Sequence, residues 1–170
     1  MHGAETLRLG VVVMLSLLLV WAAASDVRDR RIPNFCVLLV IALFLPWVIA
    51  GGPLVSGLGA AAIGFAVGYP MFLFRVMGAG DVKLFAVAAL FVGLGHLPLF
   101  ALVTVMTGGV MALASLASRP RRALAMMELR GKGDFGRGIP YGVAIAIGAA
   151  VVAWGMVLNR LPMEIAGLRL

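Results

Sequence analysis

Charged residues are scarce in this sequence. Only 12% of its 170 residues are charged, whereas 63% are hydrophobic and the mean hydropathy is +1.10. A typical soluble domain has about a quarter charged residues, so the composition excludes an ordinary water-soluble globular protein. It predicts a chain embedded in a membrane.

Cysteine and histidine are also rare. The single cysteine, Cys36, excludes an internal disulfide and any CxxC pair for zinc or redox chemistry. His2 and His96 are far apart and have no His or Cys partner at metal-ligand spacing. No GxSxG motif, Ser/His pair or P-loop is present. We therefore expect no metal and no cofactor, and we interpret Cys36 as a small buried apolar residue.

Basic residues outnumber acidic residues by 14 to 7, giving a net charge of +7. In a soluble protein this excess would suggest a nucleic-acid partner. Here the basic residues lie in connections between apolar runs, where they orient a membrane protein. We therefore expect membrane lipid as a partner and no nucleic acid.

Glycine, proline and charged residues divide the chain into six apolar runs. About 20 apolar residues in a helix cross the roughly 30 Å hydrocarbon core. The sequence predicts one all-α domain over 1–170, a polytopic bundle of about six transmembrane helices. The expected spans are Leu9–Ser25, Ile32–Ala50, Pro53–Phe74, Val82–Gly95, Leu97–Leu116 and Ile139–Leu158.

Two of these runs contain prolines or glycines that affect their bounds. Pro33 suits the first turn of the second helix, where its missing N–H is no loss. The fourth run is short, and Gly93, Gly95 and Pro98 lie near its end. An alternative with five helices and a re-entrant segment therefore stays open.

The basic residues concentrate in alternate connections. Those after the first, third and fifth runs hold eleven of the fourteen, namely Arg28, Arg30, Arg31, Arg75, Lys83, Arg119, Arg121, Arg122, Arg130, Lys132 and Arg137. The positive-inside rule puts these connections in the cytoplasm and both termini outside a cytoplasmic membrane. The longest, 118–138, is predicted to be a basic cytoplasmic loop. Five helices would break this alternation.

Three of the seven acidic residues, Asp26, Asp29 and Asp81, lie at or near the cytoplasmic ends of predicted spans. An aspartate at the centre of a membrane helix costs about 2.5–3.5 kcal/mol, so one at or near a span is a functional candidate. Asp26 follows the first span and Asp81 precedes the fourth. In a bundle, their carboxylates would lie at one depth.

Two neighbouring carboxylates cannot both ionise cheaply, so one keeps its proton while the other acts as a base. This is the chemistry of an aspartic protease, which activates water without a metal or a covalent intermediate. Asp26 is expected at a helix C-terminus and Asp81 at a helix N-terminus beside Lys83. The helix dipoles therefore favour Asp26 as the proton holder and Asp81 as the base.

Gly78 and Gly80 directly precede Asp81 in the stretch GAGD. One interpretation is a mobile loop through which an extended substrate backbone reaches the carboxylate. The other is an interhelical turn in which Asp81 only caps the following helix. The four-residue motif does not decide between them.

Three separated stretches together resemble the type IV prepilin peptidases, membrane aspartic proteases that mature pilin-like precursors. They are SDVRDRRIPN, with Asp26 seven residues before Pro33 and eight before Asn34, then GAGDVKLF from Gly78, and GIPYGVAIAIG from Gly138. The resemblance implies that Asp26 and Asp81 are catalytic. The substrate would be a pilin-like precursor, cut at the cytoplasmic face between a short basic leader and a hydrophobic helix.

The resemblance also implies roles for neighbouring residues. Pro140 and Tyr141 would seat the last helix beside the site, and Lys83 would tune Asp81 or meet a substrate carbonyl. Asp29 corresponds to no catalytic position and is interpreted as a solvated or salt-bridging neighbour of Arg30 or Arg31.

The sequence departs from the larger bacterial members of that family. They carry an added cytoplasmic segment with paired cysteines that binds zinc, and they also N-methylate the new pilin terminus. This sequence has neither the added segment nor the paired cysteines, so methylation is not expected. Its compact form resembles the branch that serves Flp-type tight-adherence pili, or the archaeal preflagellin peptidases. The main alternative of another class is a small transporter or proton- or cation-conducting protein in which Asp26 and Asp81 bind a cation.

Overall fold

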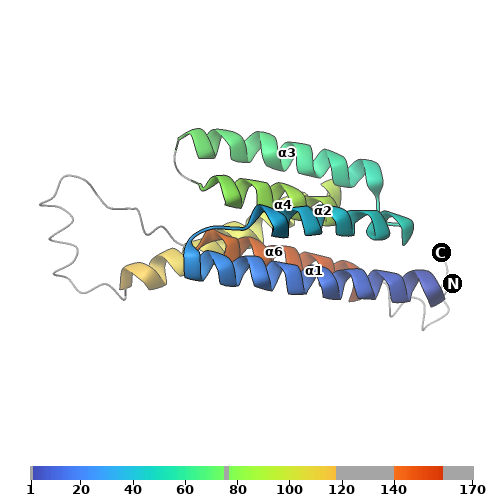
Figure 1. The fold of residues 1–170 in the computed structure, drawn as a ribbon. Helices are drawn as coiled ribbons and strands as arrows, with labels where there is room; N and C mark the ends of the chain where they lie inside the picture. The colour runs from blue at the N-terminus through green and yellow to red at the C-terminus, as the bar shows by residue number, and fades with distance from the viewer. Residues whose placement is uncertain (1, 75–76, 118–139, 159–170) are drawn as a thin grey trace, which may run out of the picture.

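The computed structural model describes residues 2–74, 77–117 and 140–158. Over these residues the protein is all-helical, as predicted. Figure 1 shows five helices, α1 (His2–Asp29), α2 (Asn34–Ile49), α3 (Leu54–Leu73), α4 (Ala79–Ala117) and α6 (Tyr141–Leu158). The predicted basic loop 118–138 lies outside the described residues.

Four of the helices, α1, α3, α4 and α6, are long and apolar enough to cross a membrane. The fifth, α2, is also apolar but has only 16 residues. Large hydrophobic side chains on the outside of the bundle are exposed, among them Leu17, Leu45, Val55 and Leu113. Lipid would cover such a surface, and the fold is that of a multi-pass membrane protein.

The prediction of six helices is wrong for the described residues. The runs expected as separate spans at 82–95 and 97–116 form one element, α4, with a kink at Gly93 (φ 72°, ψ 170°). Only glycine adopts this backbone conformation readily. The N–H of Leu94 donates a 2.8 Å hydrogen bond to Ser56 Oγ of α3. Gly95 and Pro98, the other two suspected breakers, lie within helical residues.

The chain reverses direction at Gly93, and both ends of α4 lie at the same end of the bundle in Figure 1. Phe85 and Phe100 lie on opposite sides of the kink, and their rings stack with centroids 4.5 Å apart. In a straight helix, fifteen residues would separate them by about 22 Å. The two halves of α4 therefore pack side by side.

The reversal of α4 gathers helix ends at one end of the bundle. The C-terminal ends of α1, α3 and α4 and the N-terminal ends of α2, α4 and α6 lie at the left of Figure 1. We name this the Asp26 end, because Asp26 is in the last turn of α1. The three stretches that carry the family resemblance lie at this end as far as they are described, because they include the end of α1 and the starts of α2, α4 and α6.

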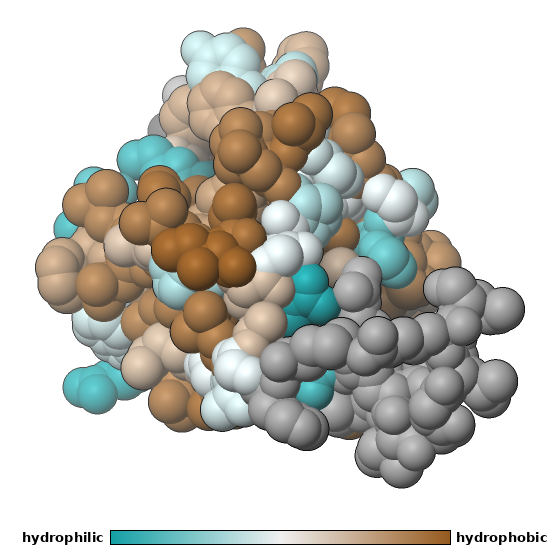
Figure 2. All heavy atoms as spheres, turned by 90° about the vertical axis from the view of Figure 1, so that its right-hand side faces the viewer, coloured by the Kyte–Doolittle hydropathy of each residue, from teal (hydrophilic) through white to brown (hydrophobic). Residues whose placement is uncertain are grey.

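Figure 2 views the bundle from the opposite end, where brown hydrophobic side chains cover much of the surface. At this end the guanidinium of Arg8 in α1 donates hydrogen bonds to the carbonyl oxygens of Ala50 and Gly51. These carbonyls follow the C-terminus of α2, where a cation is favoured by the helix dipole. Arg8 therefore ties α1 to the end of α2.

Candidate active site

Asp26 is buried, with 6% of its side chain exposed. Its Oδ2 accepts a 2.9 Å hydrogen bond from the backbone N–H of Gly142, 116 residues away in the sequence. Gly142 lies in the first turn of α6, where N–H groups have no partner within the helix. The contact therefore satisfies a buried carboxyl oxygen and an otherwise unpaired donor together.

Gly142 has no room for a side chain. A Cβ at this position would lie 2.9 Å from Oδ2 and 3.1 Å from Cβ of Asp26. The sequence analysis did not single out Gly142, although it names Pro140 and Tyr141 directly before it. A glycine in the first turn of an apolar helix, in GIPYG, is the signal that could have pointed to it.

The residues before Gly142 shape the entry to α6. The carbonyl of Pro140 accepts a 3.1 Å hydrogen bond from the N–H of Val143. The Tyr141 ring lies against the second half of α4, because a Cβ added at Gly108 would be 2.9 Å from its Cζ. Both sequence-predicted residues thus lie next to the Asp26 contact.

Asp81 is half-buried in the first turn of α4. Its Oδ2 accepts a 3.3 Å hydrogen bond from the N–H of Gly78, and the carbonyl of Gly78 accepts one from Val82 at 3.1 Å. An acidic side chain that reaches back three residues in this way forms one half of a capping box. Asp81 Oδ2 therefore closes the GAGD turn. This capping bond uses only one of the two carboxyl oxygens of Asp81.

Asp26 and Asp81 are close enough for their charges to interact. The first turn of α6 points the Gly142 N–H at Asp26, so the dipole of α6 opposes that of α1 at this carboxyl. Each aspartate thus lies near a helix N-terminus, so the helix dipoles no longer favour a proton on Asp26 over one on Asp81. The prediction that Asp26 holds the proton and Asp81 is the base loses its main physical reason.

The other motif residues lie beside Asp81. Lys83 Nζ donates a 3.2 Å hydrogen bond to Asn34 Oδ1 at the start of α2. Pro33 precedes α2, and its carbonyl accepts hydrogen bonds from the first turn of that helix. The two motifs, which are 49 residues apart at this contact, are thus brought together. Asp29 is exposed at the end of α1.

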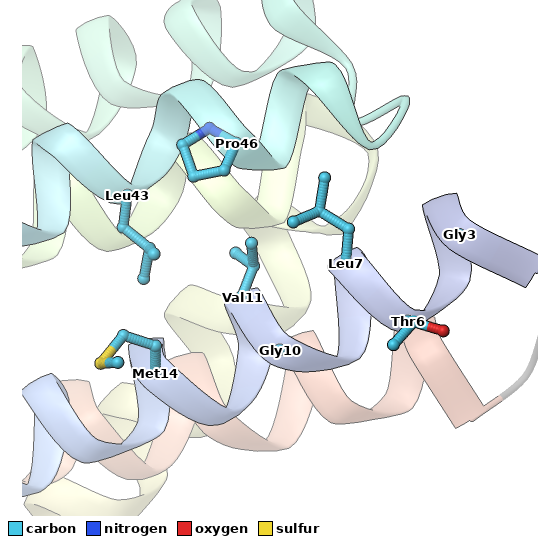
Figure 3. Close-up of a pocket in the computed structure, with 8 residues that line it drawn as sticks. All are labelled: Gly3, Thr6, Leu7, Gly10, Val11, Met14, Leu43 and Pro46. Carbon is cyan, nitrogen blue, oxygen red and sulfur yellow. The ribbon is translucent and has the colours of Figure 1, made fainter.

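Among the grooves that described residues form, two lie along α1. The larger, of about 770 Å³, runs between the first half of α1 and the last turns of α2, as Figure 3 shows, far from the Asp26 end. Its lining, which includes Leu7, Met14 and Pro46, is almost entirely apolar. The smaller, of about 530 Å³, lies between α1 and α6 and reaches Val27, Arg28 and Val143 beside Asp26. Only the second borders the candidate site.

Metal binding has no support in the part of the chain that the structure describes. Within 2–74, 77–117 and 140–158, no group of three His, Cys, Asp or Glu side chains is arranged to hold a metal ion. Among the described residues, the candidate site holds the carboxyl groups of Asp26 and Asp81, the backbone amides that bind them and the Lys83 amine nearby.

Comparison with known proteins identifies one family. The family model described as the type IV leader peptidase family matches residues 13–113, more than half of the chain. The matched part contains Asp26, Asn34 and the segment from Gly78 to Lys83, and it ends before α6. No curated protein and no solved structure matches. The resemblance drawn from the sequence motifs is therefore confirmed at the level of the family.

Proposed function

This chain belongs to the type IV leader peptidase family, and we propose that Asp26 and Asp81 are the two carboxyl groups with which it hydrolyses its substrate. Membership of the family makes the protein an aspartic prepilin leader peptidase, a membrane hydrolase. Its substrates are prepilin-like precursors. The assignment of the catalytic pair is the proposal.

The observation that carries the assignment is the meeting of two distant aspartates at one end of the bundle. Asp26 comes from the last turn of α1 and Asp81 from the first turn of α4, and these turns lie close enough for one carboxylate to affect the other. Each has one carboxyl oxygen bonded to a backbone N–H, from Gly142 and Gly78. The second oxygen of each group is the one assigned to water and substrate.

The proposed reaction uses one ionised and one protonated aspartate. The ionised carboxylate takes a proton from water as the water oxygen attacks the scissile carbonyl carbon, and the protonated partner donates a hydrogen bond to the carbonyl oxygen. The tetrahedral intermediate collapses as the C–N bond breaks, and the leaving amine takes the proton that the first aspartate accepted from water. Because the two groups share one proton, the apparent pKa values describe the pair and not either aspartate alone.

The substrate in this proposal is a precursor with a short basic leader followed by an apolar helix, of the Flp type. A scissile bond just before that helix suits a site at the end of a membrane bundle. The connections after α1, α3 and α4 all leave from the Asp26 end in Figure 1, and in the sequence they hold most of the basic residues. The positive-inside rule therefore supports a cytoplasmic location for this end.

Co-expression with a Flp-type precursor tests the proposal. Wild type should release the leader, seen as a mobility shift of the precursor, and Asp26→Asn and Asp81→Asn should each abolish the release. Asp29→Asn is the matched control, because it removes an exposed carboxylate three residues from Asp26 and should keep the activity. Full-rate cleavage by either dyad variant would refute the assigned pair.

A further inference from the structure

The linker between α1 and α2, residues 30–33, and the first residue of α2 touch the Asp81 turn at two points. Lys83 Nζ donates its 3.2 Å hydrogen bond to Oδ1 of Asn34. Gly80 packs against Ile32, because a Cβ added at Gly80 would lie 3.3 Å from the Ile32 Cβ. The two contacts therefore fall on either side of Asp81 in the sequence.

The same linker is attached to the last turn of α1. Ser25 Oγ donates a 2.8 Å hydrogen bond to the carbonyl of Arg31, and the N–H of Arg30 donates one of 3.1 Å to the carbonyl of Asp26. Arg30 has a positive φ of 54°, the backbone conformation that commonly ends a helix. A continuous series of contacts thus joins the Asp26 turn to the Asp81 turn.

The Lys83 amine is directed toward α2, where it is bonded to Asn34. Side chains two positions apart on a helix do not share a face, so Lys83 and Asp81 point in different directions from the first turn of α4. Lys83 is exposed and reaches α2, whereas Asp81 is half-buried and interacts with Asp26. The amine is therefore placed to hold the turn from outside.

We propose that Asn34 and Lys83 are positioning residues that keep the Asp81 turn in register with Asp26. This proposal rests on the catalytic role proposed above for the two aspartates. Misplacement of a reacting group by about 1 Å can lower a rate by about 100-fold. A single hydrogen bond between side chains near the surface contributes little to global stability, so its loss should appear in kcat rather than in folding.

Cleavage kinetics of the purified full chain on a precursor test the proposal. Lys83→Met and Asn34→Ala should each lower kcat by about 10- to 100-fold, with KM changed less than about threefold. The double variant should be no slower than the slower single variant, because both remove one contact. Lys83→Arg and Asn34→Asp keep a donor and an acceptor and should retain most of the kcat.

Arg28→Met is the matched control for charge. It removes an exposed basic residue from the last turn of α1, the turn that holds Asp26, so unchanged kcat there would separate positioning from a general loss of positive charge. Wild-type kcat in both single variants, or losses that add in the double variant, would overturn the proposal. So would an equal loss in Arg28→Met.

Hydrogen exchange gives a measure that does not depend on activity. The amides of Gly78 and Val82 are bonded within the turn, and they should exchange faster in Lys83→Met and Asn34→Ala but not in Arg28→Met. Unchanged exchange in both variants would also overturn the positioning role. If wild type cleaves no precursor while exchange follows the expected pattern, the catalytic assignment fails and the positioning contact stands.

Discussion

The carboxyl group of Asp26 and the backbone N–H of Gly142 form a buried hydrogen bond of 2.9 Å. It joins the last turn of α1 to the first turn of α6, two helices whose sequences are separated by the whole of α2, α3 and α4. The bond fixes the position of Asp26 Oδ2. The position of α6 therefore bears directly on the proposed dyad.

Gly142→Ala should impair the enzyme strongly. The added Cβ would lie 2.9 Å from Asp26 Oδ2, so the aspartate or the start of α6 must shift. Overpacking of this kind costs about 1–3 kcal/mol of stability, and the displaced carboxylate should lower kcat by about 10- to 100-fold. Cleavage kinetics and thermal unfolding in detergent measure the two effects.

Gly155→Ala is the matched control in the same helix, because nothing lies within 4 Å of a Cβ added there. An alanine at an open helical position should be neutral or raise stability by up to about 1 kcal/mol. Equal losses of activity in the two variants would show that α6 is sensitive to any substitution and would remove the special role of Gly142.

Local signals led to the prediction that the two aspartates form a pair. An acidic residue at each of two span ends, with basic residues on the same side, is readable from the sequence because membrane insertion penalises charge so heavily. The sequence did not identify Asp26 as the partner of Gly142, although the glycine in GIPYG marks a position that another residue could approach closely. The contact depends on which face of α6 meets α1, and an apolar helix with small residues around much of its circumference carries little information on that choice.

The helix count failed for a related reason. The sequence contains three helix breakers here, Gly93, Gly95 and Pro98, and local propensity does not tell which of them interrupts the helix. Tertiary structure decides, because the Ser56 hydroxyl of α3 accepts a hydrogen bond from the N–H of Leu94, the residue after Gly93. The chain therefore turns where a partner for the freed amide exists.

Gly93→Ala should destabilise the fold. Gly93 has a φ of 72°, and a Cβ there would also lie 2.9 Å from Ser56 Oγ. A non-glycine residue in such a conformation costs about 1–3 kcal/mol, so the unfolding midpoint in denaturant should fall. Gly95→Ala is the matched control, since that position is helical and open, and its midpoint should stay level or rise slightly. A midpoint for Gly93→Ala that equals that of Gly95→Ala would contradict the role of Gly93 as the turning point.

Thr104→Val should leave the fold as stable as wild type or make it more stable. Thr104 in the second half of α4 is 2% exposed, and in the part of the chain that the structure describes its Oγ1 has no hydrogen-bond partner. An unpaired buried hydroxyl costs about 1–3 kcal/mol, which a methyl group of similar shape avoids.

Thr107 is the control for Thr104, because its hydroxyl is paired. Its Oγ1 donates a 2.8 Å hydrogen bond to the carbonyl of Val103 one turn earlier. Thr107→Val removes a satisfied bond from the same helix and should not stabilise it. Unfolding midpoints of the two variants in one detergent measure the difference, with Thr104→Val expected to be the higher. The reverse order would mean that the Thr104 hydroxyl is bonded in the folded protein. The hydroxyl lies against Gly148 of α6, where an added Cβ would collide with it. The packing of α4 against α6 would then depend on that bond.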